Sequence, residues 1–171
     1  IYNAEFGLID EIIDANDLVS SFQYDVLGRR SRAEHLGVST IYHYRGCDDC
    51  FDYNSDAAYY MQEKVEGQSA TRVYFDALDR EVGKRWRGLT GDFYYSGQKY
   101  TAQGLPEYVA EPFSAFASIQ HETHTHYDVL GRVTQTDFPT GVSQTIVYTS
   151  QEDVATVIII ANNPISNMVI P

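Results

Sequence analysis

Two cysteines form a CxxC motif, Cys47 and Cys50, which could carry thiol–disulfide chemistry. In redox enzymes such a motif gains a reactive thiolate from the N-terminus of a helix that follows a strand. No alternation of strands and helices surrounds this motif, and Asp48 and Asp49 between the thiols disfavour a thiolate. We therefore favour the other interpretation, a local turn that a disulfide closes in an oxidising compartment.

A histidine-rich run, from His121 to His126, is a candidate metal site. On a strand, Glu122, His124 and His126 share one face. Two imidazoles and a carboxylate can bind a divalent transition metal, but neighbours on one face are about 7 Å apart, so a further ligand would have to come from elsewhere in the fold. The alternative is a polar strand face that leads into a turn at Tyr127. On that interpretation we expect no cofactor.

Aromatic residues are abundant, with 14 Tyr and 8 Phe. Trp86, Tyr94 and Tyr95 are candidates for stacking on sugar rings. The alternative, which their size favours, is that these rings pack against one face of a sheet. Trp86 also lies within a basic cluster of the sequence, formed by Lys84, Arg85 and Arg87.

The charge and the motifs exclude several classes of function. The chain has 24 acidic residues against 12 Lys and Arg, a net charge of −12, which argues against nucleic acid and anionic membranes as partners. No apolar stretch approaches the roughly 20 residues that span a bilayer. The sequence contains no GxSxG, P-loop or GxGxxG motif. We therefore expect a protein that is not an enzyme and does not span a membrane.

A short sequence motif recurs along the chain, and the structure that it forms must position the candidate residues named above. Tyr24–Arg29 reads Tyr-Asp-Val-Leu-Gly-Arg and recurs unchanged at Tyr127–Arg132, with a related copy at Phe75–Arg80. Weaker copies begin at Phe51 and Tyr100. Recurrence at a regular spacing indicates a repeat architecture.

Each copy predicts a hairpin turn. The aromatic residue ends a strand, the aspartate bonds the backbone two residues on, and the fourth turn position needs a positive φ. Aspartate is among the few residues other than glycine that tolerate such a φ, so Asp79 fits the slot that glycine fills elsewhere. The residues that define the turns are Tyr24, Asp25, Gly28, Asp76, Asp79, Tyr127, Asp128 and Gly131. A second glycine and a β-branched or aromatic run follow each copy, which predicts an antiparallel meander.

The regions outside the repeats are less regular. Glu11–Val19 could form a short helix, and Asp56–Val65 could be either a short helix or a strand. We expect an irregular crossing or a loop at 106–116, which contains two prolines. The domain prediction is an N-terminal flank at 1–19, a repeat region at 20–150 and a C-terminal strand and tail at 151–171. Since the chain opens on Ile1 without a signal sequence, we expect it to be a section of a larger protein.

The Tyr-Asp-x-x-Gly-Arg copies resemble the YD or RHS repeat over about residues 20 to 150. Such repeats occur in bacterial Rhs proteins, in the B and C components of insecticidal toxin complexes and in teneurins, where they wind into a hollow β-shell. In the bacterial toxins the shell encloses a cytotoxic polypeptide. The resemblance implies an all-β section of shell wall from a secreted or cell-surface, toxin-related protein.

The same resemblance implies partners but no chemistry. The expected partners are neighbouring repeats of the same or a partner shell protein and an enclosed toxin polypeptide. The chain has no counterpart of the family's self-cleaving segment. The arginines of the repeats, Arg29, Arg80 and Arg132, are expected to pair with acids across the meander. An alternative function is an extracellular module that binds carbohydrate or a receptor, with glycans as partners.

Overall fold

The computed structural model describes residues 1–47, 55–115, 121–151 and 154–162, with side chains up to residue 148. This part of the chain contains β-strands and turns, and it holds no helix long and apolar enough to cross a membrane. The chain divides into two units, Ile1–Tyr95 and Ser96–Pro171, which we describe separately.

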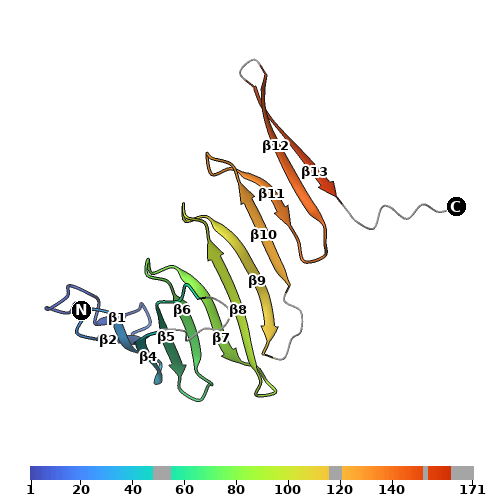
Figure 1. Cartoon of the computed structure of the whole chain (residues 1–171). Coiled ribbons are helices and arrows are strands. Elements are labelled where there is room, and N and C mark those ends of the chain that lie inside the picture. Colours follow the sequence, from blue (N-terminus) through green and yellow to red (C-terminus); the bar gives the residue numbers. More distant parts are fainter. Residues whose placement is uncertain (48–54, 116–120, 152–153, 163–171) are drawn as a thin grey trace. The chain divides into compact units, whose positions relative to one another are not determined.

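The first unit is a run of antiparallel strands in which each strand pairs with the next one along the chain (Figure 1). An isolated bridge between Tyr2 and Ile9 precedes them. Tight turns join most of the strands, so neighbours in sequence become neighbours in the sheet. The strands are β1 (Glu11–Ile13), β2 (Val19–Tyr24), β3 (Arg30–His35), β4 (Val38–Gly46), β5 (Tyr59–Val65), β6 (Thr71–Phe75) and β7 (Glu81–Arg87).

The second unit repeats this plan, again with each strand antiparallel to its successor. Its strands are β9 (Pro106–Ser114), β10 (Glu122–Tyr127), β11 (Val133–Asp137), β12 (Ser143–Gln151) and β13 (Val154–Asn162). Strand β8 (Phe93–Tyr100) crosses the division between the units. The predicted fold class, an all-β antiparallel meander of hairpins, is confirmed.

The helix expected at Glu11–Val19 is wrong, because β1 and a hairpin turn occupy these residues. The Asp14 carboxylate accepts the backbone N–H groups of Asn16 and Leu18, and local bonds of this kind compete with a helix. Within Asp56–Val65 the strand alternative is correct from Tyr59 on, since β5 pairs along its length with β4 and from Tyr59 to Glu63 with β6.

The loop expected at 106–116 is also wrong, because Pro106–Ser114 forms β9. Proline is tolerated at the first position of a strand, where Pro106 lies. The pairing with β10 covers Tyr108 to Ala110, so Pro112 lies beyond the residues that are paired with that neighbour.

Few side chains are buried in either unit. The buried apolar residues are Cys47, Ala57, Val73, Tyr74 and Val82 in the first unit and Ala110 and Phe113 in the second. Many large apolar side chains are exposed instead, among them Val26 and Leu27 at one turn and Val129 and Leu130 at another. The described residues therefore combine a small buried core with exposed apolar side chains at the turns.

Candidate functional site

One backbone geometry recurs in hairpin turns throughout the described chain. The N–H of the first turn residue bonds the carbonyl of the residue four positions on, and the N–H of the fourth residue bonds the carbonyl of the first. The fourth residue has a φ between 60° and 89°. The first residues of these turns are Asp14, Asp25, Asp76, Gly88, Thr101, Asp128 and Phe138. The geometry is therefore more general than the Tyr-Asp motif from which it was predicted.

The carboxylate of Asp76 organises the turn that it begins. Its Oδ1 accepts the backbone N–H of Leu78 at 2.8 Å and that of Arg80 at 3.0 Å. Its Oδ2 accepts Nε of Arg80 at 2.7 Å, and Nη2 lies 2.6 Å away. Asp79, at the fourth position, has a φ of 61°.

The other two YD turns repeat these contacts. Asp25 binds the backbone and guanidinium of Arg29, and Asp128 binds those of Arg132. Gly28 and Gly131 occupy the fourth positions, with φ of 76° and 78°. The expectation that the repeat arginines pair with acids across the meander is therefore wrong, because each arginine pairs with the aspartate of its own turn.

These contacts lower the pKa of the turn aspartates. For Asp25 the largest cause is the bond from the Arg29 side chain, and for Asp128 it is the backbone N–H of Arg132. Burial raises the pKa of Asp76, but the bonds from Arg80 and Leu78 together outweigh burial and lower it. The ionised form of each carboxylate is the one that the turn stabilises.

The repeat arginines also contact the sheet. The guanidinium of Arg29 lies 4.3 Å from the ring centre of Tyr44, and that of Arg132 lies 4.2 Å from the ring centre of Tyr148. A cation held over an aromatic face is attracted by the ring. Arg29 and Arg132 therefore each link their turn to a tyrosine in a later strand. The spacing of four residues between each YD aspartate and its arginine is the sequence signal that could have indicated their pairing within one turn.

The candidate metal ligands lie in two separate pairs. Nε2 of His124 is 3.2 Å from Oε2 of Glu122, whose other oxygen accepts the hydroxyl of Tyr108 at 3.1 Å. Nε2 of His126 is 3.0 Å from Oδ2 of Asp137. Among the residues that the structure describes, no group of three or more His, Cys, Asp or Glu side chains could hold a metal ion.

Two groups of this region have strongly shifted pKa values. Burial, with the charge of Glu122 and the bond to it, raises the pKa of Tyr108 to about 12. Bonds from Ser143, Gln135 and His126 lower the pKa of Asp137 to about 2. Burial is thus the main cause of the shift at Tyr108, whereas hydrogen bonds within the sheet cause the shift at Asp137.

Two of the aromatic candidates stack on each other. The rings of Trp86 and Tyr94 are 6.1 Å apart at an angle of 22°, and the Tyr94 ring also covers Gly88. Tyr95, the third candidate, is partly buried. The Trp86–Tyr94 pair thus packs along the sheet, which occupies ring faces that a sugar would need.

The CxxC motif is only partly described. Cys47 is 8% exposed and disulfide-bonded, and its sulfur lies 3.7 Å from the carbonyl oxygen of Ala57. Cys50 lies outside the described residues. A buried sulfur in a disulfide is typical of a structural cysteine.

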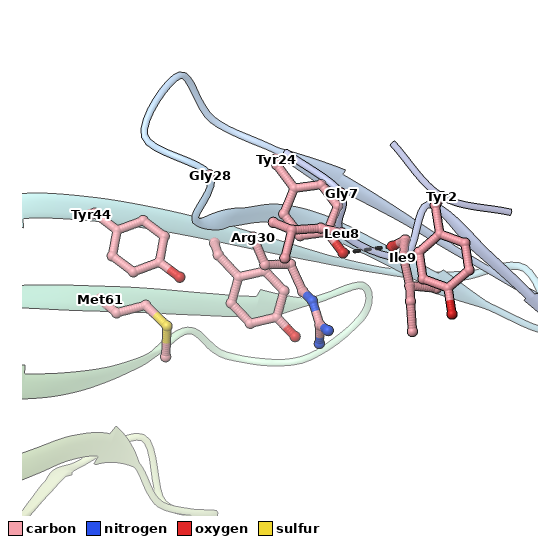
Figure 2. A pocket seen from close by; sticks show the side chains of 10 residues that line it. Tyr2, Gly7, Leu8, Ile9, Tyr24, Gly28, Arg30, Tyr44 and Met61 are labelled. Atoms are coloured by element: carbon pink, nitrogen blue, oxygen red, sulfur yellow. Dashed lines mark hydrogen bonds between the residues drawn. The ribbon is translucent and has the colours of Figure 1, made fainter. Parts of the chain in front are cut away.

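A hollow of about 660 Å³ opens on the first unit (Figure 2). The residues around it are mostly aromatic or aliphatic, with one cation: Tyr2, Gly7, Leu8, Ile9, Tyr24, Gly28, Arg30, Tyr42, Tyr44 and Met61. The hydroxyl of Tyr24 donates to the carbonyl of Ile9 at 2.5 Å, which joins the N-terminal segment to β2. The lining offers stacking surfaces and one positive charge but no acid–base pair. Sequence reasoning missed this hollow because Tyr2 to Ile9 carry no repeat signal.

The fold and its turns define a class of protein, the antiparallel β-meander built from repeated aspartate hairpins. Among solved structures, the crystal structure of TcdB2-TccC3 is similar, with a TM-score of 0.61 and 12% identity over 87% of this chain and 11% of that chain. The structure of TcdB2-TccC3-TEV aligns over 87% of this chain and 9% of that chain at 14% identity, but its TM-score of 0.40 carries no conclusion about fold. No protein-family model and no curated protein matches the chain. The resemblance to toxin-complex repeat proteins is confirmed at the level of the fold.

Proposed function

We propose that this chain is a structural section of a YD-repeat shell, which encloses or presents a polypeptide cargo of a secreted, toxin-related protein. The observation that carries the proposal is the repeated turn, which adds one antiparallel strand after another to a sheet. The likeness in fold to TcdB2-TccC3 supports it, and since the chain spans about a tenth of that protein's length, the role of the whole shell is an inference.

The exposed apolar turn tips support the same proposal. Val26 is 90% exposed and Val129 is 102% exposed, and both lie directly after the aspartate of a YD turn. In another turn, Leu89 is 109% exposed. These turn tips offer apolar side chains that adjacent protein could cover. Neighbouring repeats of the same or a partner shell protein would provide that cover.

A structural role also accounts for the recurring polar residues. Each YD aspartate is bound to its own turn, and each YD arginine pairs with that aspartate. The function proposed for them is therefore to hold hairpins in shape, with no catalytic step.

The proposed location is outside the cell or at its surface. The disulfide at Cys47 supports it, because such bonds persist mainly in oxidising compartments. Fractionation of the source cells tests the location, and recovery of the protein in the cytosol alone would contradict it.

A carbohydrate- or receptor-binding module is the second candidate, and the Tyr-lined hollow favours it. A sugar could stack on the aromatic side chains of this hollow and accept a bond from Arg30, and on Tyr44 it would use the ring face that Arg29 leaves open. A glycan array with the 171-residue chain separates the two functions. A wall section should show no saturable binding to any glycan. Saturable binding that Tyr44→Ala abolishes would overturn the wall proposal in favour of the module.

A further inference from the structure

Four cationic side chains gather on one face of β5, β6 and β7. Gln62, Arg72 and Arg85 lie directly opposite one another in register across the three strands. Lys64 is two residues after Gln62, and Arg87 is two residues after Arg85, so both share the same face. We call Lys64, Arg72, Arg85 and Arg87 the cationic cluster.

The cationic cluster lines a hollow of about 370 Å³. The other residues around it are neutral: Gln62, Gln68, Ser69, Ala70 and Phe93. A chain with a net charge of −12 thus places four positive charges and no carboxylate around one hollow. All of these residues belong to the first unit.

The cluster is not neutralised from within the described chain. Arg29, Arg32, Arg80 and Arg132 each pair with a carboxylate, whereas none of the four cluster residues has a described carboxylate within 4.0 Å. Arg72 and Arg85 are direct cross-strand neighbours, and like charges in that position destabilise a sheet. An anion bound from outside would remove this cost.

Neutral side chains orient the guanidinium groups of the cationic cluster. Nε of Arg72 donates to Oε1 of Gln62 at 3.0 Å, and its guanidinium lies 4.6 Å from the ring centre of Tyr60. The guanidinium groups of Arg85 and Arg87 lie 4.7 Å and 5.0 Å from the ring centre of Phe93. Stacking of this kind holds the planar forks in place, and such forks match carboxylates in two-point bonds.

We propose that the hollow at the cationic cluster binds the carboxylates of a short acidic polypeptide segment. A long polyanion such as nucleic acid would extend from the hollow over a chain in which acids outnumber bases 24 to 12. A short acidic segment contacts the cationic cluster without extending over the acidic remainder of the chain. The proposed peptide binding does not depend on the proposed shell function, so one proposal can fail while the other holds.

The test is a titration of the chain with fluorescein-labelled hexaglutamate, followed by fluorescence anisotropy at low salt. We expect saturable binding that weakens as salt is added, and no binding of a hexaglutamine control. The double variant Arg72→Gln/Arg85→Gln should bind about tenfold or more weakly, since charge-assisted hydrogen bonds are lost. Equal binding by the variant and the natural chain would overturn the proposal.

A matched control removes two positive charges elsewhere. Lys84 precedes Arg85 and points to the other face of β7, and Lys99 lies in β8. The double variant Lys84→Gln/Lys99→Gln should therefore bind hexaglutamate within about twofold of the natural chain. An equal loss of affinity in both double variants would mean that net charge alone attracts the peptide, which contradicts a built site.

Two further arms keep the test decisive. If the glutamine variant fails to fold, Arg72→Lys/Arg85→Lys keeps the charges without the forks and should bind with intermediate affinity; undiminished binding would contradict a role for the forks.

Inorganic phosphate tests for a simple oxyanion site, and tighter binding of phosphate than of hexaglutamate would overturn the peptide assignment. Salt-dependent self-association that the glutamine variant loses would support the proposal, with a second copy of this chain as the source of the acidic segment.

Discussion

Nε and Nη2 of Arg80 lie 2.7 Å and 2.6 Å from the same carboxylate oxygen of Asp76, four residues earlier in the chain. The other carboxylate oxygen binds two backbone N–H groups of the turn. One side chain thus fixes the turn backbone and orients a cation, and the arrangement recurs at Asp25 and Asp128. Residues that identify the repeat are therefore the residues that shape its hairpins.

Removal of the Asp76 carboxylate should destabilise the fold. Asp76 is 6% exposed, so Asp76→Ala leaves the N–H groups of Leu78 and Arg80 without this acceptor. We expect a loss of about 2 kcal/mol in the free energy of unfolding, measured in urea. Glu66→Ala removes a carboxylate from an exposed turn and should change it by less than about 0.5 kcal/mol. Similar values for the two variants would contradict the role given to Asp76.

Substitutions at the fourth turn position should follow the cost of a positive φ. Gly131 has a φ of 78°, and an added Cβ would lie at an ordinary 3.4 Å from Leu105, so backbone conformation decides the outcome. We expect Gly131→Val to destabilise most, Gly131→Ala by about 1 kcal/mol, and Gly131→Asp least, since Asp79 adopts the same conformation. Thermal unfolding ranks the three, and a variant order that follows side-chain size alone would contradict this account.

Stability should fall on acidification below about pH 4. The folded-state pKa values of Asp25, Asp76 and Asp128 are lowered, and that of Asp137 is about 2, against about 3.9 in an unfolded chain. The ionised carboxylates contribute fully to the free energy of unfolding at pH values above their unfolded-state pKa. This contribution is lost as the pH falls through their folded-state pKa values. Urea unfolding between pH 6 and pH 2 measures it. Constant stability down to pH 2 would be inconsistent with these ionised turns.

Gly88 should not tolerate a side chain. A Cβ at this position would lie 2.5 Å and 2.9 Å from carbons of the Tyr94 ring, which stacks on Trp86. Gly88→Ala should therefore cost about 1–3 kcal/mol in unfolding free energy through overpacking. Gly46→Ala is the control, because no atom of the described residues beyond its chain neighbours lies within 4 Å of the added carbon. A harmless Gly88→Ala would show that the Tyr94 ring is free to move.

The regular parts of the fold were predictable from the sequence because they depend on local chemistry. An aspartate followed by a residue that accepts a positive φ specifies a hairpin, and copies of it specify a meander. The turn at Asp14 was missed because Asp17 replaces glycine and no aromatic residue precedes it. Strand β9 was not predicted because it contains Pro106 and Pro112, and proline usually disfavours strands.

The cationic cluster depends on pairing between strands. Arg72 and Arg85 become neighbours only through the register of β6 and β7, which shifts at Tyr74 and Phe75. The hollow beside Tyr24 likewise needs Ile9, brought close by a bond from the Tyr24 hydroxyl. Neither register nor that contact follows from the local sequence.

Electron microscopy of the natural polypeptide to which these residues belong tests the central claim most directly. If the chain is a section of shell wall, averaged particles should be hollow, with this antiparallel meander forming part of a continuous β-sheet around the interior. A particle without an interior space, in which the meander lies as a separate appendage, would contradict the account.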